Sequence, residues 1–434
     1  MKQNTKLGIG LSAFIAAALA WSYTFEDQAR QPSAQERAAA AQAKVRARLV
    51  QLAPAKWRDI DYAALDARFK RMVAKPNMVG MAVGIVEQGR ITFLSGYGET
   101  LAGSGEAVTP ATVFRWASVS KGVASTMVAK LAEQGKFSLD QPVASLAPSL
   151  QLPNGVQVSA TVADVLSHRL GLYRNAFDNK LEEGQSAAML RRQLFTLSGL
   201  CAPGTCWAYQ NVAYDAASEL VEKASGRRYG DEVKRQLFDP IGMTSASVSR
   251  VGLQSAKSWA RGHSVGRREI EVNDVYYGVP AAGGINSNIK DMALWMLAQM
   301  GEMPAVLSPR LLATIHAGRV ATPGERQRMR KFLERLADPY YGLGWRSYTY
   351  AGNQVIGHRG GVDGYRSLIL FDPKRKSGVV ALWNSNTFQP GGLEFEVMDM
   401  LYRLPFRDWM ELDRGPSPAT LAAEPINASS GDRR

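Results

Sequence analysis

The spacing Ser-x-x-Lys, which can support acyl transfer, occurs twice in this chain, at Ser118–Lys121 and at Ser287–Lys290. Side chains three residues apart on a helix share one face, with Cβ atoms about 5–6 Å apart. A neutral lysine placed there can take or orient the serine proton, and a helix N-terminus favours the negative charge that develops. Because about one or two such spacings are expected by chance in a chain of this length, a site needs further motifs.

Two further patterns also occur twice each. Tyr-x-Asn supplies a phenol for proton transfer and an amide that can hold a substrate. His-x-Gly, when it lies on a strand beside the site, places an imidazole near the serine or a substrate carboxylate, and its glycine allows a close approach of the backbone. The first pattern occurs at Tyr173–Asn175 and Tyr209–Asn211, and the second at His316–Gly318 and His358–Gly360.

For each motif, its order along the chain and its local sequence indicate which of the two copies belongs to a site. Ser287 has no Tyr-x-Asn after it and is better explained as the start of a helix, with Asp291 favourable in the first turn. His316 ends the helical stretch Pro309–His316, whereas His358 ends a β-rich run.

The two tyrosines differ in the same way. Tyr173 lies in a loop, whereas Tyr209 precedes a strong helical pattern. The residues predicted to act together are Ser118, Lys121, Tyr209 and His358, with Asn211 and Gly360 as substrate-binding positions.

The elements that must position these residues follow from periodicity. Two β-rich runs separated by Glu87-Gln88-Gly89 predict a hairpin, at Val79–Val86 and Arg90–Tyr97. A helix is predicted over Ser120–Gln134, with Val123, Met127, Val128 and Leu131 on one face. Further helices are predicted over Val212–Ser225, Ser287–Met300 and Leu393–Leu404, and further strands over Gln354–His358, Tyr365–Phe371 and Gly378–Trp383. We therefore expect an α/β fold of the α+β type, in which strands from both ends of the chain form one antiparallel sheet flanked by helices, beside a mostly helical lobe.

With these motifs in this order, the chain resembles the class C β-lactamases and their low-molecular-weight penicillin-binding and esterase relatives. The similar blocks follow one another in the order expected of the family and are Phe114–Lys121, Leu166–Leu172, Pro203–Val212, Ala282–Ala293, Tyr341–Trp345 and Gly378–Asn384. The resemblance implies the β-lactamase/D,D-peptidase-like fold and a serine hydrolase.

The resemblance also implies roles for individual residues. Ser118 would form an acyl-enzyme, with Lys121 as base or proton relay. Tyr209 would pass the proton to the leaving group, and Asn211 would hold the substrate amide. The backbone N–H groups of Ser118 and Gly361 would form the oxyanion hole.

One position departs from the β-lactamases of this class, which carry Lys-Thr-Gly where this chain has His358-Arg359-Gly360. An imidazole is largely neutral at pH 7, so it would hold a β-lactam carboxylate less firmly. In carrying a histidine at this position, the chain is similar to family members that act as D,D-peptidases, D-aminopeptidases or esterases. The expected function is hydrolysis of amide or ester bonds in small or peptide substrates. A true class C β-lactamase and a non-catalytic penicillin- or cell-wall-binding module remain as alternatives.

The N-terminus predicts export. Lys2 and Lys6 precede a run without charged residues, Leu7–Phe25, that fits either a cleaved signal peptide or an inner-membrane anchor. We expect residues 1–25 to be that segment, 26–51 a helical or disordered linker, 52–412 the hydrolase domain and 413–434 a disordered tail. In the periplasm or another extracytoplasmic compartment, Cys201 and Cys206 could form a disulfide; the alternative is two free thiols.

The net charge of +13 does not by itself indicate nucleic-acid binding, because no reading motif accompanies it. In an exported protein it would favour association with anionic wall polymers. The only membrane contact expected is through the N-terminal segment. The histidines and cysteines lack the spacing of a zinc site, and nothing in the motifs requires a metal or a cofactor.

Overall fold

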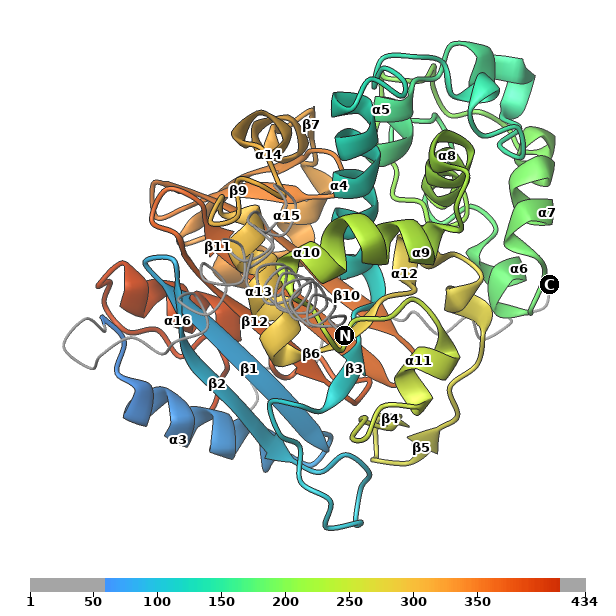
Figure 1. The fold of residues 1–434 in the computed structure, drawn as a ribbon. Coiled ribbons are helices and arrows are strands. Elements are labelled where there is room, and N and C mark those ends of the chain that lie inside the picture. The colour runs from blue at the N-terminus through green and yellow to red at the C-terminus, as the bar shows by residue number, and fades with distance from the viewer. Residues whose placement is uncertain (1–58, 414–434) are drawn as a thin grey trace, which may run out of the picture. The chain divides into compact units, whose positions relative to one another are not determined.

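The computed structural model describes residues 59–413, so the predicted leader, linker and all but the first residue of the tail lie outside the described part. Its centre is an eight-stranded sheet whose neighbouring strands all run antiparallel (Figure 1). In spatial order the strands are β2 (Arg90–Gly98), β1 (Gly80–Glu87), β12 (Ser377–Trp383), β11 (Tyr365–Asp372), β10 (Asn353–Val362), β9 (Arg346–Tyr350), β8 (Leu336–Tyr341) and β7 (Val320–Ala321). Strands from the two ends of the chain therefore meet at β1 and β12, which confirms the expected fold.

The first hairpin forms because its turn suits two linked strands. Gln88 and Gly89 both have positive φ, +49° and +74°. This backbone matches the twist of the flanking strands, and glycine adopts it without strain. The predicted strands on either side of this turn are present in the structure, with ends shifted by one residue.

Strand β1 is buried on both faces, and its side chains alternate between two hydrophobic cores. Ala82 and Val86 pack in a core with helices α4 and α13. Met81, Val83 and Ile85 pack in a second core with helices α3 and α16. The sheet is thus covered on both sides, which explains why β1 and β12 read as continuous apolar runs.

The helices lie mainly between β3 and β7 along the chain, and many of them form the lobe drawn in green in Figure 1. Their bounds are α3 Tyr62–Val73, α4 Ser120–Glu133, α5 Val162–Leu166, α6 Asp178–Glu182, α7 Ala187–Gln193, α8 Ala216–Ser225, α9 Tyr229–Val233, α10 Asp239–Ile241, α11 Arg250–Gln254, α12 Pro280–Gly283, α13 Ile289–Gln299, α14 Pro309–His316, α15 Gly324–Arg328 and α16 Leu393–Leu401. Two small sheets join β3 (Val113–Arg115) to β6 (Asn286–Asn288) and β4 (Gly262–His263) to β5 (Glu269–Ile270). No helix within residues 59–413 is both long and apolar enough to cross a bilayer.

Three expectations need correction. Helix α4 is buried almost all round rather than along one face, because helix α8 as well as α14 packs against it. The helix predicted from Ser287 begins at Ile289, because Ser287 lies in β6 and the Asn288 side chain caps the helix by accepting from Asp291 N at 2.9 Å. The helix predicted from Val212 begins only at Ala216.

Strands β8 and β9 were not anticipated. The pairing register between them shifts between Ala337 and Tyr340, where Asp338 has a φ of +49° and Pro339 follows. Such a bulge interrupts the alternation by which a strand is recognised in a sequence. These two strands nevertheless carry residues that border the site.

Candidate active site

Ser118 lies in a short 3₁₀ turn, Ala117–Val119, directly before helix α4. The turn is held firmly: the Trp116 carbonyl accepts from Ser367 Oγ at 2.6 Å, and the Trp116 indole donates to Ser287 Oγ at 2.9 Å. Ala117 has a φ of +48°, an uncommon conformation for a residue with a Cβ. Both neighbours of Ser118 are buried while Ser118 itself is partly exposed, so the turn presents its hydroxyl.

Lys121 is buried one helical turn further on, as the motif predicts. Its Nζ atom lies 3.3 Å from Ser118 Oγ, 2.6 Å from Asn211 Oδ1 and 3.0 Å from the Ala282 carbonyl oxygen. Burial lowers the pKa of Lys121 to about 7, because the charged form is costly away from water. A lysine with this pKa can exchange a proton near neutral pH.

Tyr209 lies next to Ser118 and Lys121. The centre of its ring lies 4.7 Å from Lys121 Nζ. The nearby Ser118 hydroxyl favours the ionised form of the phenol, although burial outweighs this effect on the pKa. Burial raises the pKa of Tyr209 above its usual range, so the phenol keeps its proton in the resting site. The structure therefore brings together the three side chains that the first two motifs predicted.

Asn211 connects this group to a buried carboxylate. Its Nδ2 atom donates to Asp178 Oδ2 at 2.7 Å, while its Oδ1 accepts from Lys121. Burial raises the pKa of Asp178 to about 6. Sequence reasoning missed Asp178, which begins helix α6 and belongs to none of the three motifs.

His358 lies in the middle of β10 rather than at a strand end, and it is buried. Its Nε2 is 3.2 Å from the Tyr341 hydroxyl, and its Nδ1 is 2.7 Å from the carbonyl oxygen of Arg359. Burial and the nearby cations Arg346 and Lys121 lower the pKa of His358 well below its ordinary value, so the ring is neutral. The Arg359 side chain is on the opposite face of the strand, where it pairs with Glu394.

At Gly360, strand β10 approaches the turn that carries Ser118. A Cβ atom at Gly360 would lie 2.3 Å from Ser367 Oγ, 2.4 Å from the Trp116 carbonyl oxygen and 3.0 Å from Ser118 N. Only a residue without a side chain fits these distances.

The next residue, Gly361, has a backbone N–H directed away from β11. Val362 and Tyr365 are partners across a two-residue turn and so exchange hydrogen bonds. Gly361, one position further from the turn, therefore belongs to a pair without such bonds. Strand β9 pairs with β10 only as far as Gly357, so the Gly361 N–H faces an edge that β9 leaves open. This is the orientation that an oxyanion-hole donor needs.

Three arginines share one carboxylate next to Tyr209. Glu325 lies 2.9 Å from Arg346, 3.4 Å from Arg328 and 3.8 Å from Arg174. The guanidinium carbons of Arg174 and Arg346 lie 5.4 and 6.0 Å from the centre of the Tyr209 ring. The cluster carries more positive than negative charge. Sequence reasoning missed it, because its members come from separate segments.

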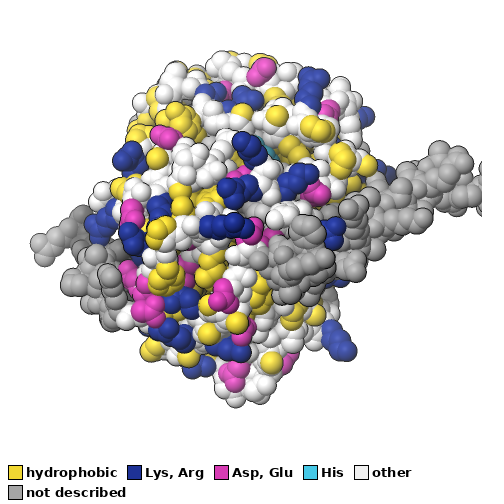
Figure 2. All heavy atoms as spheres, turned by 90° about the vertical axis from the view of Figure 1, so that its left-hand side faces the viewer, with side chains coloured by type: hydrophobic (Ala, Val, Ile, Leu, Met, Phe, Trp, Pro, Cys, Tyr) yellow, Lys and Arg dark blue, Asp and Glu magenta, His cyan; other side chains and the backbone are white. Residues whose placement is uncertain are grey.

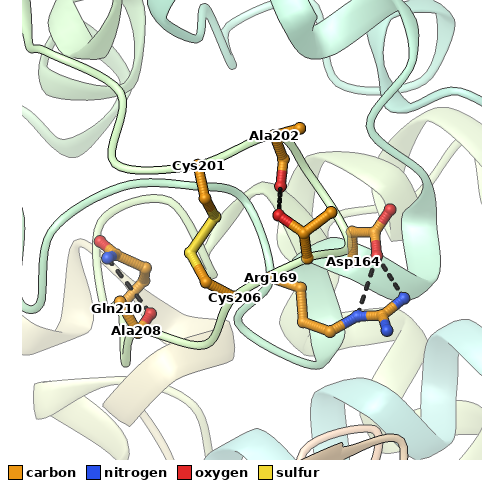
Figure 3. The surroundings of a disulfide bond; sticks show 8 residues. Asp164, Arg169, Cys201, Ala202, Cys206, Ala208 and Gln210 are labelled. Atoms are coloured by element: carbon orange, nitrogen blue, oxygen red, sulfur yellow. Dashed lines mark hydrogen bonds and ion pairs between the residues drawn. A yellow bond between two sulfur atoms is a disulfide. The ribbon is translucent and has the colours of Figure 1, made fainter.

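The loop that leads to Tyr209 is closed by a disulfide between Cys201 and Cys206 (Figure 3). Inside the loop the Thr205 hydroxyl donates to the Ala202 carbonyl at 2.7 Å. Next to it, Arg169 forms an ion pair with Asp164 at 2.7 Å, drawn in Figure 3. A covalent bond thus stabilises the segment directly before Tyr209.

The other motif copies have structural roles. Ser287 Oγ accepts a hydrogen bond from the Trp116 indole N–H. His316 is the last residue of α14, and its Nε2 is 3.0 Å from Gln299 Oε1. The Asn175 N–H donates to the Tyr209 carbonyl at 2.8 Å, so the loop of the other Tyr-x-Asn supports Tyr209 from outside. Residues 59–413 contain no group of three His, Cys, Asp or Glu placed to hold a metal ion.

These features define a serine–lysine–tyrosine site beside the inner strand β10 of an antiparallel sheet. The sequence model of the Beta-lactamase family matches residues 65–398, and the chain belongs to this family. Its members are typically serine hydrolases.

Curated relatives include an unguisins hydrolase from Aspergillus campestris, 27% identical over 79% of this chain and 65% of the relative. A penicillin-binding protein 4 from Amycolatopsis lactamdurans is 25% identical over 79% of this chain and 89% of the relative. This chain thus spans just under two thirds of the length of the fungal relative.

Solved structures share the fold. A penicillin-binding protein homologue from Pyrococcus abyssi, described as octameric, has a TM-score of 0.73 at 22% identity, over 81% of this chain and 80% of that one. A class C β-lactamase mutant has a TM-score of 0.65 at 22% identity, over 79% and 97%. A D-stereospecific amidohydrolase from Streptomyces sp. has a TM-score of 0.59 at 22% identity, over 75% and 95%. The β-lactamase/transpeptidase-like fold expected from the sequence is therefore confirmed.

Proposed function

We propose that this chain hydrolyses amide or ester bonds of small or peptide substrates through an acyl-enzyme on Ser118, like a D,D-peptidase, D-aminopeptidase or esterase. The observation that carries the proposal is the position of Lys121. A buried lysine whose pKa is lowered to about 7 lies 3.3 Å from the Ser118 hydroxyl. A lysine with these properties is suited to act as a base towards serine.

The hydrogen bonds around Lys121 support this role. Asn211 Oδ1 and the Ala282 carbonyl can only accept, so a neutral amine gives them its two hydrogens and turns its lone pair to Ser118. Ser118 Oγ, 3.3 Å from Lys121 Nζ, can then donate its hydrogen to that lone pair. In the proposed resting site, the hydrogen of Ser118 therefore already points to the lysine that would accept it when the serine is activated.

In the proposed reaction, Ser118 Oγ bonds to the substrate carbonyl carbon as its proton moves to Lys121. The oxyanion is held by the N–H groups of Ser118 and Gly361. Tyr209 protonates the leaving amine or alcohol and recovers a proton from Lys121. Water then attacks the ester carbonyl carbon. Its proton passes to the Tyr209 oxygen as the phenol proton moves to Lys121, and Lys121 protonates Ser118 Oγ as the acyl–oxygen bond breaks. One water is consumed for each bond that is hydrolysed.

The charges near the site favour a substrate with a free carboxylate. His358 is neutral, but Arg174, Arg328 and Arg346 share only one carboxylate, that of Glu325. Arginine binds carboxylates through paired N–H groups. The names of similar proteins, a penicillin-binding protein and a D-stereospecific amidohydrolase, support peptides or amides that contain D-residues.

Labelling with fluorescent penicillin and a fluorophosphonate, followed by a panel of D-alanyl peptides, esters and nitrocefin, tests the proposal. Ser118→Ala should abolish both labelling and turnover. Ser287→Ala, in the other Ser-x-x-Lys, should keep them, although its thermal midpoint should fall with the loss of the Trp116 hydrogen bond. Rapid steady-state nitrocefin turnover would favour a class C β-lactamase instead. Labelling without turnover of any substrate would favour a penicillin-binding module.

We also propose that the protein is exported and acts outside the cytoplasm, held to the inner membrane if residues 7–25 are not cleaved. The basic start and the apolar run support this, and the disulfide fits an oxidising compartment. The basic side chains that gather near the centre of the face in Figure 2 would suit an anionic cell wall. To test export, a reporter that works only outside the cytoplasm is fused after residue 50. The fusion should show reporter activity. An intact fusion without reporter activity would reject export.

A further inference from the structure

Three buried side chains from three separate segments form one hydrogen-bonded row beside Tyr209. His168 follows helix α5, Tyr341 ends β8, and His358 lies in β10. The Tyr341 hydroxyl is 3.1 Å from His168 Nε2 and 3.2 Å from His358 Nε2. A single phenol thus joins two imidazoles.

The hydrogens in this row can be placed because its two ends are backbone groups. The Gln210 N–H can only donate, and it lies 3.2 Å from His168 Nδ1. The hydrogen of a neutral His168 is therefore on Nε2 and points to the Tyr341 oxygen. Tyr341 must then donate its own hydrogen to His358 Nε2, which leaves the hydrogen of His358 on Nδ1. That hydrogen is donated to the Arg359 carbonyl at 2.7 Å, so every position is satisfied.

The same row holds the backbone on both sides of Tyr209. The Ala208 N–H donates to the His168 carbonyl at 3.0 Å, and the Gln210 N–H donates to the His168 ring. The His168 ring also packs on the Tyr209 ring, with centroids 4.4 Å apart. His168 has a φ of +60°, which an L-residue adopts only when its surroundings hold it there.

We infer that His168 and Tyr341 are positioning residues of this active site, which hold Tyr209 for proton transfer and fix His358 as the neutral tautomer with its hydrogen on Nδ1. The inference rests on the proposed function in giving Tyr209 the proton transfer. It also revises the role expected of His358: its Nε2 is occupied by Tyr341 and is not free to act as a base or as a charged anchor.

The charged groups around the row keep both rings neutral. Lys121 and Arg346 face both imidazoles, and Arg174 also faces His168. Burial lowers the pKa of both histidines well below the ordinary value, and Arg346, together with Lys121 whenever it is protonated, lowers it further. Each neutral ring supplies one N–H donor and one acceptor nitrogen to the row. Protonation would turn the acceptor nitrogen into a second donor, which would then face another donor.

Nitrogen NMR of histidine rings tests the hydrogen positions without using activity. The chain has four histidines, so a sample with ¹⁵N-labelled histidine gives few signals. His168 and His316 should carry hydrogen on Nε2, and His263 and His358 on Nδ1, because His263 Nε2 accepts from the Ala102 N–H at 3.2 Å. Assignment uses single substitutions of His263 and His316. Hydrogen on Nε2 of His358, or titration of either row histidine between about pH 6 and 8, would overturn the inference.

Kinetics test the positioning role. Tyr341→Phe keeps the ring and removes the shared hydroxyl. As a matched control, Tyr340→Phe removes the hydroxyl of an exposed tyrosine at the preceding residue of β8. Tyr341→Phe should lower kcat by about 10- to 100-fold with little change in KM, since a shift of about 1 Å can cost about 100-fold. Tyr340→Phe should stay near the native value. If both variants behave alike, or if only KM changes in Tyr341→Phe, the row has no positioning role.

The conservative pair His168→Asn and His168→Gln separates the two contacts of this side chain. An asparagine amide reaches the place of Nδ1 and can still accept from Gln210, whereas a glutamine amide reaches the place of Nε2 and can still donate to Tyr341. Each should restore part of the kcat that His168→Ala loses. Equal loss in all three, with the fold intact by circular dichroism, would contradict the assignment. Correct tautomers in a protein whose Ser118→Ala variant stays active would instead reject the proposed function and leave the row as a structural feature.

Discussion

Asn211 lies between Lys121 and a buried carboxylate, and its two amide atoms bond one to each: Oδ1 to Lys121 Nζ at 2.6 Å, and Nδ2 to Asp178 Oδ2 at 2.7 Å. The negative charge of Asp178 raises the pKa of Lys121 and partly offsets the effect of burial. The amide that the motif assigns to the substrate therefore also connects Lys121, the proposed base, to the carboxylate that raises its pKa.

This relationship predicts the pH dependence of the reaction. In the proposed reaction neutral Lys121 is the active form, and its pKa is about 7, so kcat/KM should rise with pH through about 7. Asp178→Asn keeps a hydrogen-bond acceptor but removes the charge that raises the pKa of Lys121. The acidic limb should then move to lower pH, by about 1 unit. Asp140→Asn, an exposed site, is the control. A shift to higher pH would contradict the assignment of Lys121 as the base.

Gly360→Ala should damage the site through packing alone. The added methyl group would meet Ser367 Oγ, the Trp116 carbonyl and Ser118 N at 3.0 Å or less. We expect a loss of about 1–3 kcal/mol in the free energy of unfolding, together with slower acylation by fluorescent penicillin. Gly324→Ala, which meets nothing within 4 Å, should leave both unchanged. Normal acylation by Gly360→Ala would show that β10 does not lie this close to the nucleophile.

The arginine cluster predicts substrate preference. Arg346→Gln should lower kcat/KM by about 10- to 100-fold for a D-alanyl peptide with a free carboxylate, the amount expected for a hydrogen bond to a charged group. The same peptide ending in an amide should be affected less than about threefold, because it gives the cation no partner. Arg310→Gln, on an exposed part of α14, is the control. Equal losses on both peptides would mean that Arg346 supports the site without binding the carboxylate.

The disulfide predicts a measurable stabilisation. Replacing both Cys201 and Cys206 by serine should lower the free energy of unfolding by about 2 kcal/mol, as expected for closing a short loop. Native protein analysed without reductant should be 2 Da lighter than its reduced form, by the mass of two hydrogens. A reductant should lower the thermal midpoint of the native protein but not that of the double variant. An equal effect of reductant on both proteins would argue against a bond at this position.

The sequence predicted the elements that a regular period or a long apolar run marks clearly. The strands around Val83 and Val380 are long apolar runs next to clear turns, and the structure contains them. The strand that ends at Tyr341 was missed, because a bulge at Asp338 and Pro339 interrupts its alternation.

The site divides in the same way. Ser118, Lys121 and Tyr209 belong to motifs with fixed spacing, so their meeting could be expected. Asp178 and Arg346 approach them only through tertiary packing, and no spacing in the chain records that. Tyr341 stood inside a recognised block, Tyr341–Trp345, but only its contacts with two histidines give it a role.

The pairing of β1 with β12 has a consequence for the time at which the protein becomes active. Met81 has its partner in Trp383, so the first hairpin emerges from the ribosome long before the strand that completes it. Ser118 is also made early, whereas His358, Gly360 and Gly361 arrive near the end. Contacts between such distant parts of a chain form late and slowly. An incomplete chain would therefore hold Ser118 without the strand that should line its site, and synthesis itself would delay the proposed hydrolysis until the last strands are in place.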